Sequence, residues 1–441
     1  MKITFIMPSV GKKDGQKKYM KSWCMEPLAV AQLASLTPQN IQVEFFDDRI
    51  EDIDYNTNSG LVAINIETYT ARRAYEIAKK YKDNGKMVVM GGFHATLMQE
   101  EVLLHADAVV VGEAEKIWIQ VIDDFKKGEL KKVYKSSVRS ELNNITPDRT
   151  IYKGKKFLKL GLIETGRGCN YNCDFCSIAS FYRQSYRYRP INDIVSEIKK
   201  LNYNNYFFVD DNICNDTKHA KELFKALIPL KIKWISQASI NIAKDEELLE
   251  LMKKSGCQGV LIGFESLDHD VLQKMNKKFN SAQGYKDAIN KIHNFGIRIY
   301  ATFVFGYGQE DEKYFKETYK FAISQKFFMT AFNHLVPFPG TPLYNKLKDD
   351  NKLLHNKWWL NPDYTFGQLA FRPESISPNE LSRLCYKYRK KFYSWRSIFW
   401  RLFNFKTNFY SMRSLFIFFS VNIMSKIDVK KRQGLVLGKE K

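Results

Sequence analysis

Short apolar runs alternate with helix-like patterns along the first part of the chain. The runs that read as strands are 3–7, 41–46, 61–66, 87–90 and 108–111. Segments with a helical spacing of apolar residues lie between them, at 27–36, 71–84, 97–104 and 114–125. Strands and helices that alternate in this way are typical of a doubly wound parallel sheet. We therefore expect an α/β domain of this kind over residues 1–130.

A second strand-helix series follows a break in the pattern. Residues 131–157 are polar and Lys-rich and contain Pro147, which predicts a linker over the surface. Beyond it, strands are expected at 158–164, 206–210, 232–236, 259–263, 297–305 and 329–335, with helices such as 192–201, 245–254 and 282–295. Six strand-helix units predict a partial (β/α)6 TIM barrel over 158–342, with its chemistry at the carboxyl ends of the strands. Residues 343–441 are expected to form a mostly helical capping region and a basic, aromatic tail.

Three cysteines follow the first strand of this predicted barrel. Cys169, Cys173 and Cys176 have the spacing C-x3-C-x2-C. A structural zinc site takes four protein ligands, whereas three thiolates suit an iron–sulfur cluster in which one iron is left open to a small molecule. The alternative is that the cysteines meet by chance, or that they bind zinc with a distant fourth ligand. The motif predicts a catalytic cluster on these three residues.

With Phe175 as the aromatic residue, C-x3-C-x-aromatic-C resembles the signature of the radical S-adenosylmethionine (SAM) enzymes. The resemblance implies a [4Fe-4S] cluster whose open iron binds the amine and carboxylate of the methionine part of SAM. One electron then cleaves SAM to a 5′-deoxyadenosyl radical. It also implies an electron donor such as a reductase or flavodoxin.

Polar residues at the predicted strand ends would supply the SAM contacts. Asp210-Asp211-Asn212 stands where the family has Gly-Gly-Glu, so the methionine amine is expected to meet Asp210 or Asp211. By the same resemblance, Glu265 would contact the ribose or methionine end, and the strand that ends at Gly306 would line the adenine. Gln237 would complete the polar mouth of the barrel. For any single acidic residue, a helix cap or an ion pair is the alternative.

The strand ends of the first domain carry a second set of candidates. They are Ser9, Thr68, Gly91, Gly92, His94, Gly112 and Glu113. A glycine pair lets a backbone approach a ligand closely, although turn and cap chemistry could also explain these residues. Gly-Gly-x-His-Ala-Thr followed by Gly-Glu-Ala-Glu resembles the Rossmann-like cobalamin-binding domain of one radical SAM subgroup. That subgroup includes the anaerobic cyclase of bacteriochlorophyll synthesis and the cobalamin-dependent radical methyltransferases, and the resemblance covers nearly the whole chain.

One departure from other cobalamin domains concerns the lower ligand of cobalt. The methionine-synthase type uses Asp-x-His-x-x-Gly after the first strand, but residues 10–25 contain no histidine here. The resemblance therefore implies cobalamin without that histidine ligand. His94 is either a residue that packs the loop or a cobalt ligand.

The net charge of +21 is concentrated in the tail. From residue 381 onward, fifteen Lys or Arg stand against Asp428 and Glu440, a net charge of +13 in 61 residues. Basic residues between Phe, Trp and Tyr predict peripheral contact with anionic lipid and a hydrophobic substrate such as an isoprenoid or other lipid. The apolar run at 415–424 is shorter than the ~20 residues of a membrane span. The alternative is a terminal helix that packs on the barrel while its lysines stay in water.

The remaining cysteines and the N-terminus indicate a reducing compartment. Three of the seven cysteines belong to the motif, and the other four are too scattered for a disulfide framework. The first apolar run is too short for a signal peptide and is stopped by Pro8. We expect a cytoplasmic protein, with the membrane contact described above.

These features together favour a radical SAM enzyme that uses cobalamin to methylate an unactivated carbon of an organic substrate. A radical cyclase or oxidase of the same subgroup is the nearest alternative. A tRNA methylthiotransferase would need a second cluster on three cysteines, but residues 1–150 contain only Cys24. A module that binds nucleic acid through the basic tail is the alternative from another class, and nothing in the cysteine motif calls for it.

Overall fold

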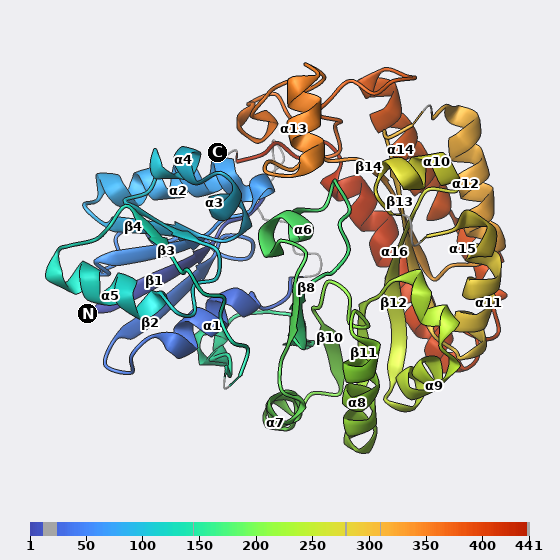
Figure 1. Ribbon diagram of the computed structural model, residues 1–441, viewed down its shortest axis with the longest axis horizontal. Helices are drawn as coiled ribbons and strands as arrows, with labels where there is room; N and C mark the ends of the chain where they lie inside the picture. Colours follow the sequence, from blue (N-terminus) through green and yellow to red (C-terminus); the bar gives the residue numbers. More distant parts are fainter. Residues whose placement is uncertain (12–23, 144, 278–279, 309, 439–441) are drawn as a thin grey trace.

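The computed structural model describes residues 1–11, 24–143, 145–277, 280–308 and 310–438. Two α/β units lie side by side along the long axis of the molecule, and the C-terminal helices pack on the second unit (Figure 1). The strands are β1 Lys2–Met7, β2 Gln42–Asp47, β3 Leu61–Asn65, β4 Met87–Gly91, β5 Ala108–Val111, β6 Val133–Lys135, β7 Gly161–Ile163, β8 Gly166–Gly168, β9 Tyr186–Tyr188, β10 Asn205–Phe208, β11 Lys233–Gln237, β12 Cys257–Glu265, β13 Arg298–Phe305 and β14 Met329–His334. The helices are α1 Leu28–Leu36, α2 Ala71–Asp83, α3 Phe93–Leu97, α4 Gln99–Leu103, α5 Trp118–Lys127, α6 Ser177–Tyr182, α7 Ile191–Leu201, α8 Thr217–Leu227, α9 Glu246–Lys254, α10 His269–Lys274, α11 Tyr285–Asn294, α12 Glu312–Ser324, α13 Pro342–Asp349, α14 Pro378–Phe392, α15 Trp395–Leu402 and α16 Met412–Arg432.

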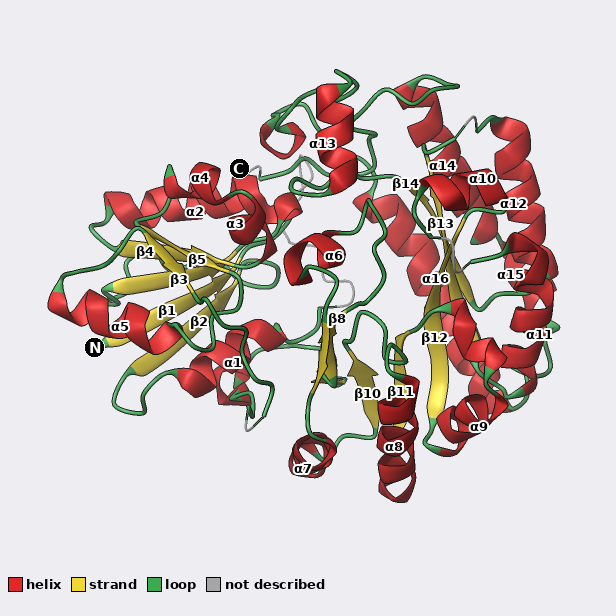
Figure 2. Cartoon of the chain, viewed as in Figure 1, coloured by secondary structure: helices red, strands yellow, loops and turns green. Residues whose placement is uncertain are grey.

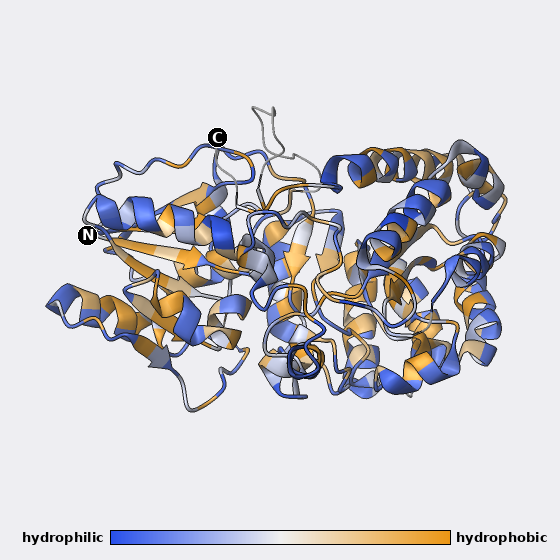
Figure 3. Ribbon diagram, turned by 90° about the horizontal axis from the view of Figure 1, so that it is seen from above, coloured by the Kyte–Doolittle hydropathy of each residue, from blue (hydrophilic) through white to orange (hydrophobic). Residues whose placement is uncertain are grey.

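The N-terminal unit is the expected doubly wound sheet. Its strands are parallel in the order β2-β1-β3-β4-β5-β6. Helices α1 and α5 cover one face, and α2, α3 and α4 cover the other (Figure 2). Strand residues are apolar on both faces and helix residues are hydrophilic on their outer side (Figure 3), as a sheet buried between two helical layers requires.

One strand of this sheet lies in the segment that we expected to be a linker. Val133–Lys135 forms β6, which pairs in parallel with β5 at the edge of the sheet. Only Tyr134 of this strand is buried, and its hydroxyl donates a hydrogen bond to Asp124 (2.9 Å). A three-residue edge strand among lysines has too few apolar positions to be recognised from the sequence.

The second unit is a partial barrel of six parallel strands. Their order is β14-β13-β12-β11-β10-β7, and β7 and β14 are the two free edges. The six strands that the sequence predicts are all present, although the first is shortened to Gly161–Ile163. Helix α14 packs along β14, and α16 packs on α14.

A short two-stranded sheet encloses the cysteine motif. Strand β8 ends directly before Cys169, and β9, with which it pairs antiparallel, follows helix α6. The sequence did not reveal it, because two strands of three residues are too short to show an alternation of polar and apolar positions.

The end of the chain returns to the N-terminal unit. Val436 pairs with Thr365, and the Gly438 amide donates a hydrogen bond to the Val10 carbonyl (3.0 Å). Leu437 is fully buried there. Among the helices of the described residues, none combines the length and the apolar composition that crossing a bilayer would need.

Candidate functional site

The predicted cluster cysteines lie on a loop across the carboxyl end of the barrel. The loop begins at Gly168, which has φ +86° and where a Cβ would lie 2.0 Å from the Ser185 carbonyl oxygen, so only glycine fits. Hydrogen bonds tie the loop to residues that follow three different barrel strands: Gly168 N to Asp211 Oδ2 (3.2 Å), Asn170 N to Asn215 Oδ1 (3.2 Å), Asn276 Nδ2 to Asn172 O (2.7 Å) and Leu343 N to Asp174 O (3.1 Å). The barrel thereby fixes the loop over its own mouth.

The three thiols lie close enough to influence one another. Burial, together with a smaller effect of nearby thiols of the same loop, raises the pKa of Cys169 to about 11 and that of Cys173 to about 12. Burial also raises the pKa of Cys176, while the Lys277 ammonium acts in the opposite direction on all three. In a buried site, thiols of this kind lose their protons when a nearby positive charge, such as that of iron, stabilises the thiolate form.

The donor set consists of three thiols on one loop, the ligands that a cluster with one open iron would use. In an iron–sulfur cluster each thiolate binds a different iron, so the sulfurs need only surround a wider space. Phe175 packs half-buried against the core between Cys173 and Cys176, which holds this stretch of the loop in place.

A buried ion pair beside the thiols was not foreseen. Lys277 Nζ lies 2.5 Å from Glu265 Oε1, and both side chains are almost completely buried. Glu265 ends β12 with φ +63°, a backbone conformation that residues other than glycine rarely adopt. A Cβ at Gly263 would lie 2.2 Å from Glu265 Oε1 and 2.7 Å from Lys277 Nζ, so this glycine leaves room for the pair. No spacing rule links Lys277 to the motif, and only the fold brings it to the cysteines.

The two aspartates after β10 have different partners. Asp210 is buried and accepts hydrogen bonds from Thr165 Oγ1 (2.7 Å) and Thr165 N (3.2 Å). Asp211 accepts the Gly168 amide at the start of the cysteine loop. Burial raises the pKa of Asp210 to about 7 and that of Asp211 to about 6. Asp211 is therefore the aspartate that touches the loop, whereas Asp210 joins two strand ends.

Gly306 and Gln237 also lie at strand ends, as expected. Gly306 has φ +114° and donates its amide to Glu310 Oε1 (3.0 Å), which also accepts the amides of Tyr307 and Gly308. Gln237 ends β11, and its carbonyl accepts the Ile213 amide (3.0 Å). The predicted SAM residues thus share one rim of the barrel, which is the rim that the cysteine loop covers.

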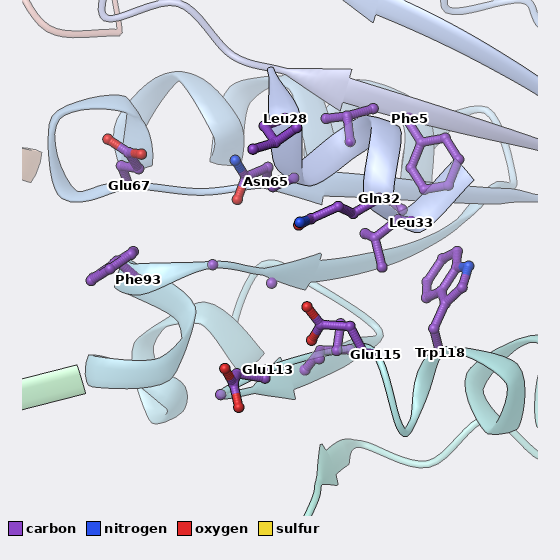
Figure 4. A pocket seen from close by; sticks show the side chains of 18 of the residues that line it. Phe5, Leu28, Gln32, Leu33, Asn65, Glu67, Phe93, Glu113, Glu115 and Trp118 are labelled. Carbon is purple, nitrogen blue, oxygen red and sulfur yellow. The ribbon is translucent and has the colours of Figure 1, made fainter. Parts of the chain in front are cut away.

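A cavity of about 440 Å³ lies between the two units (Figure 4). Four of the residues predicted at the ends of the N-terminal strands line it: Gly91, Gly92, Gly112 and Glu113. The barrel side contributes Glu164, Arg167, Val209, Phe181 and Tyr182. The last two end α6, the helix that begins directly after Cys176. One short helix therefore joins the cysteine loop to the wall of the cavity.

The wall of the cavity combines open glycine backbone with an apolar slot. Gly112 has φ +82°, and a Cβ there would meet nothing within 4 Å, so the glycine backbone faces open space. Further in, Phe5, Leu33 and Trp118 form an apolar slot between the sheet and helices α1 and α5 (Figure 4). Glycines that admit a macrocycle and a slot that admits an apolar base are what cobalamin would need.

A buried arginine connects the two units at the edge of the cavity. Arg167 contacts Glu113 (3.0 Å) and Glu115 (2.6 Å) of the N-terminal unit and Glu164 (2.7 Å) of the barrel. Burial would raise the pKa of Glu113, but hydrogen bonding by Arg187 and the charge of Arg167 hold it below its usual value. Arg167 lies two residues before Cys169, and nothing in the residues around it indicates partners more than 50 residues away.

Three predicted contacts lie outside the cavity wall. The His94 ring is fully buried, with Nδ1 3.2 Å from Thr68 Oγ1 and Nε2 3.1 Å from Glu101 Oε1. Glu101 also accepts a hydrogen bond from Trp359 Nε1 (2.8 Å). Burial would raise the pKa of Glu101, but these hydrogen bonds lower it to about 2.

Ser9 lies in a second network, where it donates hydrogen bonds from its amide and its hydroxyl to Asp48, which pairs with Arg73. His94, Thr68 and Ser9 are therefore held in hydrogen-bond networks beneath the loops. Asn65 and Glu67, which shortly precede Thr68 in the chain, line the cavity instead.

Comparisons with known proteins give a consistent result. A model of the radical SAM superfamily matches residues 163–322. Bacteriochlorophyllide d C-12(1)-methyltransferase of Chlorobaculum tepidum is 31% identical over 430 residues, covering 90% of this chain and 92% of that protein. The C-8(2)-methyltransferase of the same organism is 29% identical, covering 85% and 87%. A structure of the radical SAM methyltransferase TsrM from Kitasatospora setae, with cobalamin and a [4Fe-4S] cluster bound, has a TM-score of 0.67 at 16% identity and covers 87% of this chain and 81% of that one.

Proposed function

Because this chain belongs to the radical SAM superfamily, we propose that it is a cobalamin-dependent methyltransferase that acts on an unactivated carbon of an organic, hydrophobic substrate. The observation that carries the proposal is helix α6. It starts at the last cysteine of the motif and ends in Phe181 and Tyr182 at the cavity between the units. A cluster on the loop and cobalamin in the cavity would then face one space at the rim of the barrel. The two methyltransferases described above, similar over nearly their whole length, support methylation as the outcome.

The bound groups supply the hard chemistry: the cluster and SAM generate a 5′-deoxyadenosyl radical that removes a hydrogen atom, and cobalamin supplies the methyl group. The protein's own residues bind and orient them. Cys169, Cys173 and Cys176 would hold the cluster, and Lys277 would place a positive charge beside the thiolates. This charge partly offsets the negative charge that the thiolates bring into a buried site.

The rim residues would hold SAM, and the N-terminal sheet would hold cobalamin. Asp211 and Glu265 place carboxylates near the cysteine loop, where a methionine amine could be bound, and the end of β13 with Gly306 would line the adenine. Gly91, Gly92 and Gly112 would lie against the macrocycle. Glu113 is paired with two arginines, so its role would be to fix the wall between the units.

Cobalamin in this cavity would have no histidine below the cobalt. The residues 10–25 contain none, although 12–23 of them lie outside the described part of the chain. Both ring nitrogens of His94 already have protein partners. This arrangement supports the histidine-free binding that the sequence predicts.

Two partners complete the proposal. Cleaving SAM requires one electron at a time, so a reductase or flavodoxin would bind near the cysteine loop. Peripheral contact with a membrane is supported by the net charge of +13 over the last 61 residues and agrees with a hydrophobic substrate.

The test uses anaerobically reconstituted full-length protein, a hydrophobic extract of the source cells and SAM with a deuterated methyl group. Mass spectrometry should find a product that carries the labelled methyl, formed together with 5′-deoxyadenosine. The Cys176→Ala variant should form neither, and the Cys24→Ala variant should form both. A product that gains no label, with 5′-deoxyadenosine still formed, would replace methylation by a cyclisation or an oxidation.

A further inference from the structure

Helix α15 and the segments beside it expose a group of large aromatic rings, which we call the aromatic face. The exposed fraction of these side chains ranges from 49% at Trp395 to 73% at Phe416. The aromatic face consists of Trp395, Phe399, Trp400, Phe403, Phe405 and Phe416. Monomeric proteins rarely leave so many neighbouring rings in water without a use for them.

Neighbouring rings of the aromatic face contact one another. Trp395 and Phe399 are four residues apart on one side of α15, and Phe403 caps the helix another four residues on. The rings of Trp395 and Phe399 have centroids 6.3 Å apart, and Phe403 lies at the same distance from Phe405 in the following loop. Phe399 also contacts Phe419 of α16 (5.7 Å), which extends the surface to the second helix.

The opposite side of α15 is firmly anchored, so the rings cannot turn inward without unfolding it. Ile398 and Arg401 are fully buried. Arg401 donates hydrogen bonds to the Phe327 and Phe328 carbonyls (3.0 Å each) and to Asn422 Oδ1 (2.8 Å). This guanidinium ties α15 both to β14, which starts at Met329, and to α16. The aromatic face is therefore a fixed outer surface of the fold.

Basic side chains border the aromatic face, and the segment that carries its rings has no acidic residue. Residues 381–427 contain no Asp or Glu. Arg396, Lys406 and Arg413 are exposed at the border. Lys426 lies over the Trp395 ring at 4.3 Å and Lys326 over the Trp400 ring at 5.8 Å. Apolar rings with cationic groups around them complement the two layers of an anionic membrane surface, acyl chains and charged headgroups.

We infer that the aromatic face is a docking surface for an anionic lipid bilayer. The rings enter the headgroup boundary, and the five cations meet the phosphates and carboxylates around them. This inference deepens the membrane contact of the proposed function and rests on it, while no residue of the cysteine loop or the cavity takes part. Helix α15 lies at the end of the molecule opposite the N-terminal unit (Figure 1), so docking leaves the cavity between the units uncovered.

A second copy of the chain fits this surface less well. A symmetric dimer would place the same basic border of each copy against the other, and like charges across an interface are unfavourable. Nucleic acid would be attracted by the charge, but its bases would have to reach rings that project from a convex helix. Both remain measurable outcomes of the experiment.

The experiment is co-sedimentation of the reconstituted full-length protein with vesicles of phosphatidylcholine alone or mixed with phosphatidylserine. We expect binding to the mixed vesicles at low salt and weak binding to the neutral ones. The ring variant Phe399→Ser/Phe403→Ser/Phe405→Ser and the charge variant Arg396→Gln/Lys406→Gln/Arg413→Gln should each bind at least about tenfold less tightly. The control variant Lys132→Gln/Lys135→Gln/Lys218→Gln removes the same number of exposed charges elsewhere and should bind nearly as the natural protein does.

Cluster and cobalamin absorbance of each variant shows that it is folded, and this readout is independent of lipid binding. Equal binding by the ring variant and the control variant would overturn the inference. Two other results would also overturn it. One is that protein loaded with cluster and cobalamin does not bind mixed vesicles. The other is that the protein binds no lipid but self-associates or binds RNA, and the ring variant abolishes this.

Discussion

The cysteine loop and the edge of the N-terminal sheet carry information about function in different ways. In the loop, three side chains within eight residues are the chemistry, so their spacing alone predicts the cluster. At the sheet edge, the residues of the resembling motifs divide into two groups. Gly91, Gly92 and Gly112 line the cavity, whereas His94 is buried in a hydrogen-bond network beneath it. A site made of ligand side chains is therefore readable from spacing, whereas a site made of backbone and shape is readable only in part.

The largest effect should come from the loop itself. Replacing Cys169, Cys173 or Cys176 with alanine should abolish both the brown absorbance and the formation of 5′-deoxyadenosine, because each thiolate holds one iron and two thiolates would not retain the cluster. Anaerobic absorbance spectra and chromatography of the nucleoside measure these two results, with Cys24→Ala as the control. A triple variant that keeps its iron would remove the loop from the account.

A smaller but still large effect is expected at the ion pair beside the loop. Lys277→Met leaves the Glu265 carboxylate buried without its cation, which should lower the free energy of unfolding by about 3 kcal/mol. Urea unfolding of the cofactor-free protein measures it. The double variant Lys277→Met/Glu265→Gln should recover most of the loss, since neither charge remains. If the single variant is as stable as the natural protein, the pair is solvated and does not shape the site.

At the sheet edge, filling the cavity should weaken cobalamin binding. A Cβ at Gly91 has ordinary contacts, 3.5 Å from the Val110 Cβ, so Gly91→Leu should fold while its side chain takes space from the ligand. We expect at least about tenfold weaker binding of cobalamin in titrations, since a buried clash of this size costs over 1 kcal/mol, with iron content unchanged. Gly284→Leu, where a Cβ meets nothing within 4 Å, is the matched control. Loss of iron together with cobalamin would show instead that the two sites fold as one.

A moderate effect is expected from pH at the barrel rim. Burial raises the pKa of Asp210 from 3.8 to about 7, so the folded state holds this proton more tightly than the unfolded state. The contribution to stability is complete below pH 3.8 and is lost as the pH rises to about 7. In SAM-free protein, Tm should therefore fall less between pH 5 and pH 8 for Asp210→Asn than for the natural protein. In a chain of this size, each kcal/mol of lost stability should correspond to about 2–4 °C of Tm or less. Identical pH profiles of the two proteins would refute the assigned protonation.

The smallest effect is expected at His94. Electron paramagnetic resonance of the Co(II) form should show no triplet splitting from a nitrogen ligand, and His94→Ala should leave the spectrum unchanged. His94→Ala removes one partner of Glu101, so only a modest loss of stability should accompany it. Triplets that disappear in this variant would make His94 a cobalt ligand and would reverse the contrast drawn between the two regions.

Much of the fold could be predicted because its strands are long enough to show a pattern. All six barrel strands and the first five strands of the N-terminal sheet were expected within a few residues of their positions. β6, β8 and β9 were missed, since each has three residues and an alternation cannot be recognised over so short a stretch.

The candidate site could be predicted only in part for a related reason. Asp211, Glu265 and Gly306 follow strands, and parallel strands bring their carboxyl ends together, so the rim could be inferred from the order of elements. Lys277 lies in a loop and Arg167 in the three-residue strand β8, and their partners Glu265 and Glu113 are 12 and 54 residues away. A charged residue in such a stretch is ordinarily solvated. Their roles depend on burial, which only the folded chain reveals.

The most direct test of the central claim is the metal content of one reconstituted preparation. If the loop holds a [4Fe-4S] cluster and the cavity holds cobalamin, elemental analysis of anaerobically reconstituted, desalted protein should give iron and cobalt in a ratio of about four to one. Cys169→Ala should lose the iron and Gly91→Leu the cobalt. Protein that retains its iron but no cobalt, even with cobalamin in excess, would contradict the account of the cavity and with it the proposed methyl transfer.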